Sequence, residues 1–331
     1  MTDAISHPGR LLAISGACWQ ASTLHAAVKL DVFSAIGDGS ASPAKVAEAI
    51  EADPRAVSML LNALTAMDLL CKEGDVFANT EESRNFLVKS APGYVGYIIG
   101  HHHHLGSGWR RLDEAVRSGR PVRGRISFDD PDVRRNFLLG MFNIASLLAP
   151  RVAERVDLSG KRRLLDLGGG PGTYAIHFCL KYDQLEAAVF DRPATRPFAE
   201  ETIARFGLER RIAFLAGDYL TAAIPGSYDV AWVSHILHAE GPQVCGDILQ
   251  KVYDGLAPGG LILVHDFILD ESMDGPLFPA LFSLNMLQGT DSGQAYSRGE
   301  IESMLQAAGF MNITPIGLGR PNDSGIVAAT K

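Results

Sequence analysis

Beyond residue 160 the chain alternates short apolar runs with helical stretches, and this alternation restricts the possible folds more than any other feature. The runs are RLLDLG, AAVFD, IAFLAGD, YDVAWVS and GGLILVHDF. Each has the length and apolar content of a strand buried on both faces. Strands separated by helices are typical of βαβ units, so we predict an α/β fold with a mostly parallel, doubly wound, Rossmann-like sheet.

The first hundred residues have a different, mainly helical pattern. Residues 54–70 carry apolar side chains at steps of three and four after Pro54, which predicts an amphipathic helix over this range. The segment SPAKVAEAI before it predicts a shorter helix opened by Ser42 and Pro43. The segment LLCKEGDVFANT after it predicts two short strands around a Gly-Asp turn. Two helices and a hairpin in this order are the winged-helix pattern.

A winged helix often binds DNA, with its second helix in the major groove. Here that helix carries little charge, because Arg55 and Asp68 are the charged residues between positions 55 and 70. The chain has 30 basic and 38 acidic residues and a net charge of −8, the wrong sign for a protein that neutralises phosphates. We therefore predict that the helix is buried in a dimer interface, which the apolar segment from Leu11 to Ile36 extends. A DNA-binding regulator that senses a nucleoside is the alternative from a different class.

The length of 331 residues suggests two domains, at roughly 150 residues each. We expect a winged-helix-like dimerisation domain over residues 1–105, and connecting helices with a ligand-binding α/β domain over residues 106–331. The cysteines at positions 18, 71, 179 and 245 have no paired spacing, so neither a zinc site nor a disulfide framework is indicated. The N-terminus lacks the pattern of an export signal, and no apolar run is long enough to span a bilayer. We expect a cytoplasmic protein without nucleic acid or membrane as a partner.

The first apolar run ends in a glycine-rich turn, DLGGGPG, over residues 166–172. Glycines at such a turn let the chain pass tightly from strand to helix and let a ligand approach the backbone amides. The dinucleotide fingerprint G-x-G-x-x-G fails, because Thr173 stands where its last glycine is needed. A nicotinamide oxidoreductase is therefore disfavoured, and the pattern present is D-x-G-x-G-x-G.

Two further carboxylates end the following strands. Asp191 follows Gly170 by twenty-one residues, which suits a residue that accepts hydrogen bonds from ribose hydroxyls. Asp218 ends the third strand in LAGDYL. Because the carboxyl ends of parallel strands meet at one edge of a sheet, these residues predict a crevice for a nucleoside ligand.

Several motifs together cover nearly the whole chain: DLGGGPG, FDRP, GDYL, HILHAEGPQVC, the APGG turn at 257–260 with LILVHDFIL, and YSRGEIESMLQAAGF. On these motifs the sequence resembles the S-adenosylmethionine-dependent small-molecule O-methyltransferases of the caffeic acid and acetylserotonin type. The resemblance implies a class I methyltransferase fold with an antiparallel final strand. It also implies a homodimer whose N-terminal domain helps to line the partner's acceptor pocket, S-adenosylmethionine as cofactor, S-adenosylhomocysteine as product, and no metal.

The resemblance also assigns site residues. His238 matches the family's general base, although Ala239 and Glu240 stand where the family has Asp and Trp. Asp266 matches one of the two carboxylates that flank this histidine, and the position of the other falls near Ala295. The residues that match the cofactor site are Asp166, Gly168, Gly170, Gly172, Asp191, Asp218, Tyr219, Ser234 and His235. Those that match the acceptor pocket are Met141, Phe142, Asn143, Phe282, Asn285 and Met286.

The reaction itself indicates what the enzyme must do. Methyl transfer from a sulfonium is an in-line displacement, so the nucleophile has to be held roughly 3 Å from the methyl carbon. Ionising a phenol of pKa about 10 at pH 7 costs about 4 kcal/mol. A histidine backed by a carboxylate recovers part of this cost as a general base, so we predict O-methylation of a small aromatic hydroxyl compound. The alternative is C-methylation of a tetrapyrrole or polyketide-like acceptor, because the altered HAE motif weakens the argument for a phenol base.

Two further histidines raise the question of a metal site. His235 lies three residues before His238, which is a possible ligand spacing, and His265 precedes Asp266 on its strand. No cysteine or further carboxylate cluster accompanies them, so we predict no metal. We expect His265 to point away from Asp266, because neighbouring residues of a strand face opposite sides of the sheet.

Overall fold

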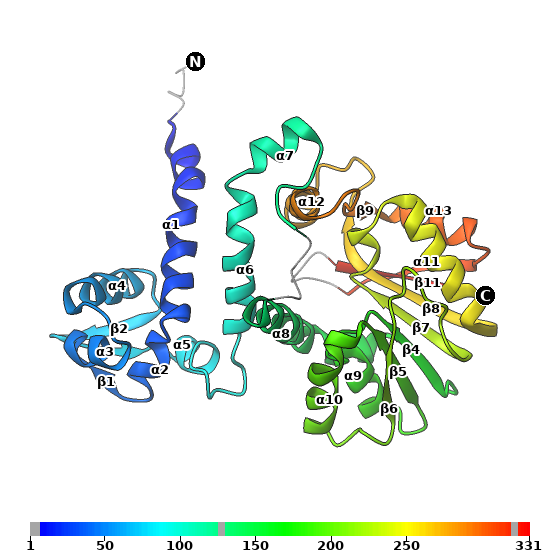
Figure 1. Cartoon of the computed structure of the whole chain (residues 1–331), viewed down its shortest axis with the longest axis horizontal. Helices are drawn as coiled ribbons and strands as arrows, with labels where there is room; N and C mark the ends of the chain where they lie inside the picture. The colour runs from blue at the N-terminus through cyan, green and yellow to red at the C-terminus, as the bar shows by residue number, and fades with distance from the viewer. Residues whose placement is uncertain (1–6, 125–129, 319–323) are drawn as a thin grey trace, which may run out of the picture. The chain divides into compact units, whose positions relative to one another are not determined.

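The structure, a computed structural model, describes residues 7–124, 130–318 and 324–331, and its contacts divide the chain into two units. Unit 1 comprises residues 1–105 and unit 2 comprises residues 106–331 (Figure 1). Helix α6 (Gly96–Trp109) contains the boundary between them.

Unit 1 is a small helical unit with one three-stranded sheet. Its elements are α1 (Gly9–Lys29), α2 (Val32–Ile36), β1 (Ser40–Ala41), α3 (Pro43–Ala49), α4 (Pro54–Ala66), β2 (Leu70–Glu73), β3 (Val76–Asn79) and α5 (Glu81–Phe86). The strands are antiparallel in the order β1-β3-β2. The side chains of Ser42 and Asp53 cap α3 and α4 by accepting from backbone N–H groups at Lys45 and Ala56. Two helices followed by a hairpin reproduce the predicted winged-helix order.

The second helix is shorter than the sequence pattern predicted. We expected a helix over 54–70, but α4 ends at Ala66 and β2 begins at Leu70. Asp68 adopts a left-handed conformation with φ 58°, and the N–H of Leu69 donates back to the carbonyl of Leu64 at 2.9 Å. This turn ends the helix and directs the last leucines into the hairpin, which apolar spacing alone does not reveal.

The two long helices of unit 1 differ in how much apolar surface they bury. On α4, Leu61 and Leu64 are fully buried against Phe33 and Phe77, which form the centre of the core. Helix α1 instead exposes a row of large apolar side chains, with Trp19 77% exposed. The others in the row are Leu11, Leu12 and Ile14. An exposed set of this size is typical of a surface that another protein covers.

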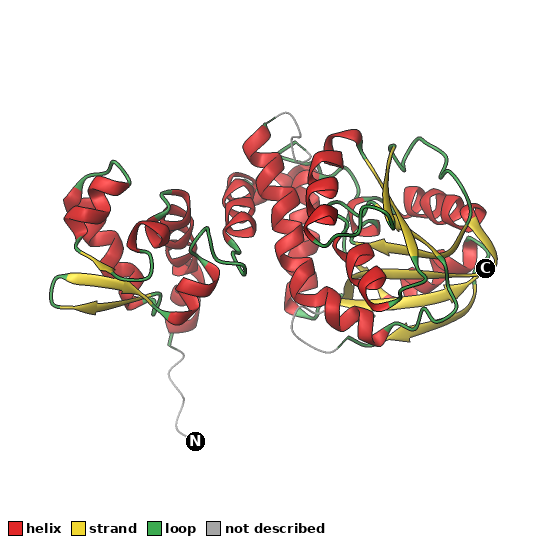
Figure 2. Cartoon of the chain, turned by 90° about the horizontal axis from the view of Figure 1, so that it is seen from below, coloured by secondary structure: helices red, strands yellow, loops and turns green. Residues whose placement is uncertain are grey.

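Unit 2 is a three-layer α/β domain. Its strands are β4 (Arg163–Leu167), β5 (Glu186–Asp191), β6 (Ile212–Ala216), β7 (Tyr228–Ser234), β8 (Leu256–Leu269), β9 (Tyr296–Ser297), β10 (Met311–Ile316) and β11 (Ser324–Thr330). Its helices are α7 (Leu112–Ser118), α8 (Pro131–Arg155), α9 (Thr173–Lys181), η1 (Pro193–Thr195), α10 (Arg196–Arg205), η2 (Leu237–Ala239), α11 (Pro242–Gly255), α12 (Leu277–Gly289) and α13 (Arg298–Ala307). Helices cover both faces of the sheet (Figure 2). The fold is therefore of the predicted α/β class.

The strand order explains where a ligand can bind. The sheet runs β10-β11-β8-β7-β4-β5-β6, with β9 beside β8. Neighbours from β8 to β6 are parallel, and β11 is antiparallel to β8, as the resemblance implied. The chain moves outward from β4 through β5 to β6 and then returns to the other side of β4 with β7. This reversal opens a crevice at the carboxyl ends of β4, β5 and β7.

Helix α8 packs as a core helix of unit 2. Among the described residues it is the one helix long and apolar enough to cross a membrane, by length and composition only. Its residues Leu148 and Val152 belong to the hydrophobic core that also contains Phe178 and Trp232. Burial inside the domain accounts for its apolar face.

Candidate active site

The glycine-rich turn after β4 forms the floor of the crevice. Gly168 and Gly172 have φ of 62° and 78°, a region that side-chain-bearing residues seldom adopt. A Cβ on Gly168 would lie 2.3 Å from Cδ1 of Ile236, so a larger residue there would displace the end of the Ile236 side chain. The N–H of Gly170 donates to Oδ2 of Asp191 at 2.8 Å, which joins the turn to the end of β5. Tyr219 lies against the same turn, near Gly168.

Two carboxylates, of buried Asp166 and half-buried Asp191, give the crevice its acceptor groups. Asp166 is 1% exposed, Oδ2 accepts from the N–H of Ala175 at 3.4 Å, and Oδ1 has no hydrogen bond to a described residue. Burial raises the pKa of Asp166 to about 7. Burial also raises the pKa of Asp191, against the hydrogen bonds from the N–H groups of Arg192 and Gly170. The carboxylate oxygens of Asp166 and Asp191 that lack partners or retain lone pairs can accept hydrogen bonds from the hydroxyl and amino groups of a ligand.

Asp218 lies at the outer part of this crevice and is more exposed. Its Oδ1 accepts from the N–H of Leu220 at 3.0 Å, and its Oδ2 lies 3.9 Å from Nη2 of Arg192. The three predicted acidic strand ends therefore lie at the same edge of the sheet, with Asp166 buried and Asp191 and Asp218 half-buried.

His265 links the end of β7 to the start of β11. Its Nδ1 lies 2.8 Å from Oγ of Ser234 and its Nε2 lies 3.0 Å from Oγ of Ser324. The ring is fully buried and stacks on Trp232. Burial lowers the pKa of His265 well below its usual value, so the ring is neutral and bridges the two hydroxyls. Its hydrogen-bond partners, Ser234 and Ser324, differ from His238, the partner of the Asp266 carboxylate.

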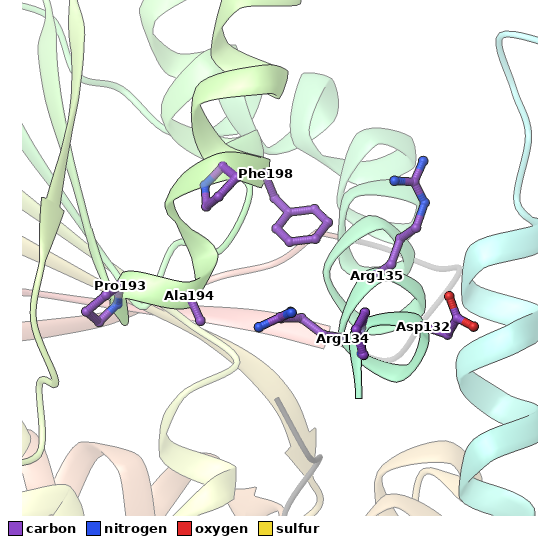
Figure 3. Close-up of a pocket in the computed structure, with 8 residues that line it drawn as sticks. Asp132, Arg134, Arg135, Pro193, Ala194 and Phe198 are labelled. Atoms are coloured by element: carbon purple, nitrogen blue, oxygen red, sulfur yellow. The ribbon is translucent and has the colours of Figure 1, made fainter. Parts of the chain in front are cut away.

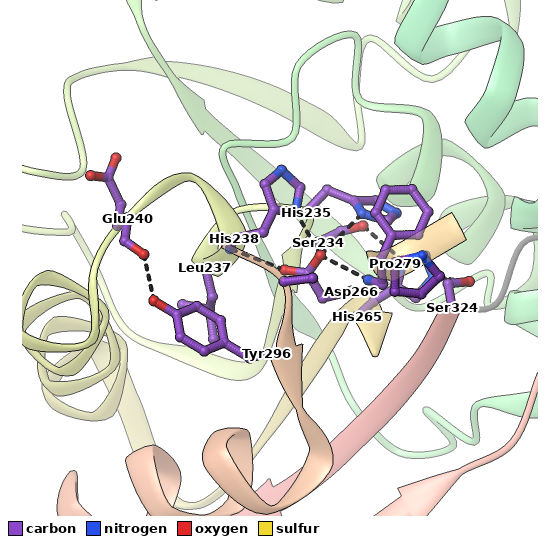
Figure 4. Close-up of polar contacts among 12 residues, drawn as sticks. Ser234, His235, Leu237, His238, Glu240, His265, Asp266, Pro279, Tyr296 and Ser324 are labelled. Atoms are coloured by element: carbon purple, nitrogen blue, oxygen red, sulfur yellow. Dashed lines mark hydrogen bonds and ion pairs between the residues drawn. The ribbon is translucent and has the colours of Figure 1, made fainter. Parts of the chain in front are cut away.

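His238 and Asp266 form a buried pair (Figure 4). Nδ1 of His238 lies 2.6 Å from Oδ1 of Asp266, and the backbone N–H of His238 donates to Oδ2 at 3.3 Å. The N–H of Phe267 also donates to Oδ1, at 2.9 Å. His238 is 8% exposed and Asp266 is 3% exposed. The short η2 helix and the end of β8 thus hold both side chains in one geometry.

The charges of this pair follow from its surroundings. Burial alone would raise the pKa of Asp266, but His238 and His235 beside it hold that pKa well below its usual range. The carboxylate is therefore ionised, and a carboxylate accepts a proton rather than donating one. Nδ1 of His238 consequently carries the hydrogen, which leaves the lone pair of Nε2 for another partner.

His235 completes a triad with this pair. It adopts φ 56°, in the left-handed region, and its Nδ1 lies 3.4 Å from Oδ1 of Asp266, a close contact without hydrogen-bond geometry. Potential ligand atoms of His235, His238 and Asp266 lie within 4.8 Å of one another. The donor set alone would suit a metal ion, but Oδ1 of Asp266 already engages both imidazoles. The absence of a metal from the reaction remains a prediction.

Aromatic rings cover the open side of His238. Phe282 on α12 lies 4.8 Å from the His238 ring, and Phe267 lies 4.7 Å from Phe282. Asn285 and Met286 are buried one turn further along α12. The structure therefore places Phe282 against His238, with Asn285 and Met286 further along the same helix. Those of α8, namely Met141, Phe142 and Asn143, are half-buried on their own helix.

Glu240 and Ala295 show how the altered motif packs. The carbonyl of Glu240 accepts from the hydroxyl of Tyr296 at 2.6 Å, and its carboxylate points away from Asp266 (Figure 4). Ala295 is fully buried, and its N–H donates to Oγ of Ser283 at 3.1 Å. Neither residue supplies a second carboxylate to His238. Asp266 is therefore the carboxylate that contacts its ring.

A surface pocket lies beyond Asp191 rather than at His238 (Figure 3). It lies between the start of α8, with Asp132 and Arg134, and the segment after β5, with Pro193 and Phe198. Neither Asp191 nor the pair of His238 and Asp266 lines it.

A glycine turn with acidic strand ends on this strand order, beside a histidine–carboxylate pair, defines a class I S-adenosylmethionine-dependent methyltransferase. Sequence comparison agrees: residues 109–311 match the O-methyltransferase domain and residues 12–89 match the O-methyltransferase dimerisation domain. The chain belongs to the S-adenosylmethionine-dependent O-methyltransferase family. S-Adenosylmethionine is its cofactor, and small molecules are the substrates of this class of enzyme.

Relatives match over almost the whole chain. A 3-hydroxy-5-methyl-1-naphthoate 3-O-methyltransferase of Streptomyces sahachiroi is 32% identical over 98% of this chain and 95% of that protein. Acetylserotonin O-methyltransferase of Bos taurus is 30% identical over 88% of each chain. Among solved structures, human N-acetylserotonin methyltransferase in complex with S-adenosylmethionine has a TM-score of 0.88 at 26% identity, covering 100% of this chain and 99% of that one.

Proposed function

We propose that the enzyme transfers the methyl group of S-adenosylmethionine to a hydroxyl oxygen of a small aromatic molecule, with His238 as the general base. The observation that carries this proposal is the 2.6 Å contact between Nδ1 of His238 and Oδ1 of Asp266. Because this contact uses Nδ1, Nε2 is the ring nitrogen of His238 that can accept a proton, and the ring lies beside the aromatic side chains of Phe267 and Phe282.

Each residue of the site has a separate task in this reaction. S-Adenosylmethionine, when bound, supplies an electrophilic methyl group on a sulfonium. The glycine turn and Asp191 hold the nucleoside part, and Phe282 lies against the acceptor ring. Nε2 of His238 accepts the hydroxyl proton as the oxygen attacks, and Asp266 stabilises the imidazolium that forms. The apolar rings keep water away from this proton transfer.

The acceptor class rests on the shape and polarity of the α12 side of the site. Phe278, Phe282 and Met286 give an apolar surface suited to a flat ring, and Asn285 adds a polar group. Names of relatives support an aromatic hydroxyl, since one is the naphthoate 3-O-methyltransferase and another is a tetracenomycin polyketide synthesis 8-O-methyl transferase.

The test is to identify the methylated atom. The native protein is incubated with ¹³C-methyl S-adenosylmethionine and a panel of phenols, catechols, flavonoids and hydroxynaphthoic acids, and products are examined by NMR. A methyl ether carbon supports the proposal, and a methyl group on carbon or nitrogen contradicts it. Nitrogen transfer is the second candidate, because an N,N-dimethyltransferase, OxyT of Streptomyces rimosus, is 30% identical over 91% of this chain.

We further propose that the enzyme is a homodimer assembled through unit 1. Leu12, Ile14 and Trp19 of the exposed apolar row on α1 lie within the segment that matches the dimerisation domain, and a second copy of the chain is the expected occupant of this surface. Trp19→Glu together with Leu12→Glu should convert the dimer into a monomer in light scattering. A native monomer, or a dimer unaffected by both changes, would contradict the assembly.

A further inference from the structure

Arg123 places a positive charge beside α12, and among the described residues no carboxylate pairs with it. Its guanidinium Nη2 donates to the backbone carbonyl of Asn285 at 3.2 Å and to Oδ1 of the same residue at 3.3 Å. No ion pair joins Arg123 to any described residue, and burial lowers the pKa of its guanidinium. A half-buried cation held only by neutral oxygens is stabilised when an anion joins it.

The backbone holds this arginine firmly in place. The N–H groups of Val122 and Arg123 both donate to the carbonyl of Gln288, at 3.0 and 3.1 Å. The guanidinium lies over Gly289, where a Cβ would come within 2.4 Å of its Nη1. Gly289 thus leaves the space that the guanidinium fills, and any side chain there would displace it.

Unsatisfied polar atoms surround the guanidinium. Gln288 is fully buried, and neither end of its side-chain amide has a hydrogen-bond partner among the described residues. Its Oε1 and Nε of Arg123 both lie within 3.3 Å of the position that a Cβ on Gly108 would take. Nε of Arg123 is buried and unpaired, whereas Nη1 is unpaired within the described chain but accessible. Nη1 is therefore the donor that a ligand can reach.

The position along α12 links this donor to the acceptor site. Phe282, Asn285 and Gly289 are spaced by three and four residues, so they lie on one face of the helix. Phe282 contacts His238 at one end of this face, and Arg123 contacts Asn285 and Gly289 further along. At a rise of about 1.5 Å per residue, the guanidinium lies roughly 5–10 Å along the helix from the catalytic contact.

We propose that Arg123 is a specificity-determining residue that binds a carboxylate of the methyl acceptor. This inference rests on the proposed function and names its substrate class: aromatic acids that carry the reacting hydroxyl at His238 and the carboxylate on the far side of the ring. Nη1 of Arg123 donates to the carboxylate, which supplies a negative charge to the half-buried guanidinium. Asn285 orients the guanidinium by accepting from Nη2.

The experiment compares a hydroxynaphthoic acid with its carboxamide, which keeps the ring and hydroxyl but removes the charge. Binding of each is titrated to the native protein saturated with S-adenosylhomocysteine, and methyl transfer is measured in parallel with S-adenosylmethionine. We expect the acid to be preferred about 10- to 100-fold, as for a hydrogen bond to a charged group. Arg123→Met should abolish this preference while leaving carboxamide binding within about threefold.

The control is Arg120→Met, which removes an exposed arginine three residues away and should keep the preference for the acid. Equal binding of acid and carboxamide by the native protein would overturn the proposal. An equal loss of affinity for the acid and for the carboxamide in Arg123→Met, with an unchanged melting temperature, would also overturn the proposal. Preference for the acid without any methyl transfer to oxygen would support the carboxylate subsite and contradict the proposed function. Methyl transfer to oxygen without a preference for the acid would support the proposed function and contradict the carboxylate subsite.

Discussion

Replacing Asp266 by Asn tests whether the carboxylate acts through His238. The substitution keeps the size of the side chain and the acceptor for the N–H of Phe267, but it removes the negative charge 2.6 Å from the imidazole. A hydrogen bond to a charged group contributes about 1.5–3 kcal/mol. If this contribution is realised when the imidazolium forms, kcat falls about 10- to 150-fold.

The assay is transfer of labelled methyl from S-adenosylmethionine at saturating substrates, with His238→Ala and the double variant alongside. His238→Ala should lower kcat by about 10²–10⁴. The double variant should be no slower than His238→Ala, because the carboxylate has no imidazole left to stabilise. Asp270→Asn, an exposed change near the end of β8, is the matched control and should leave kcat unchanged. If the double variant loses kcat by the product of the two single losses, Asp266 does not act through His238.

Three further predictions concern the crevice. Gly168→Ala should abolish cofactor binding in calorimetry while the protein stays folded, since the new Cβ would meet Ile236; native affinity in this variant would count against the tight turn. Burial raises the pKa of Asp166 to about 7, so its ionisation destabilises the cofactor-free fold as pH rises from about 4 to 7. Asp166→Asn should therefore raise the free energy of unfolding at pH 8, by up to about 4 kcal/mol, and change it little at pH 4; an equal effect at both pH values would argue against a buried charge. Dialysis against a chelator should leave kcat within about twofold, and a loss reversed by one divalent metal would assign a metal to His235, His238 and Asp266.

Local sequence patterns predicted the catalytic unit well because its elements have strong local signals. The five apolar runs became β4 to β8, and the glycine turn took positive φ at Gly168, Gly170 and Gly172. Periodicity failed at the end of α4, where a left-handed Asp68 ends the helix although the apolar spacing continues. Such a turn depends on the hairpin that follows it rather than on the helix pattern.

Contacts between distant residues carried no local signal. Arg123 meets Asn285 across 162 residues of sequence, in a polar Pro/Arg/Gly stretch that resembles an ordinary linker. The bridge from Ser234 through His265 to Ser324 joins three separate strands. A lone arginine or serine in such segments is usually exposed, so only the folded chain distinguishes these residues from surface ones.

The most direct test of the account is a single-turnover comparison of native protein and His238→Ala with ¹³C-methyl S-adenosylmethionine and a phenolic acceptor from the panel. His177→Ala, which removes a histidine that packs against Phe206, serves as the control. We predict a methyl ether formed by the native and control proteins, and a rate lower by at least about 10² in His238→Ala with unchanged cofactor binding. Label on carbon or nitrogen, or a His238→Ala rate within a few fold of native, would contradict the assignment of His238 as the base for oxygen methylation.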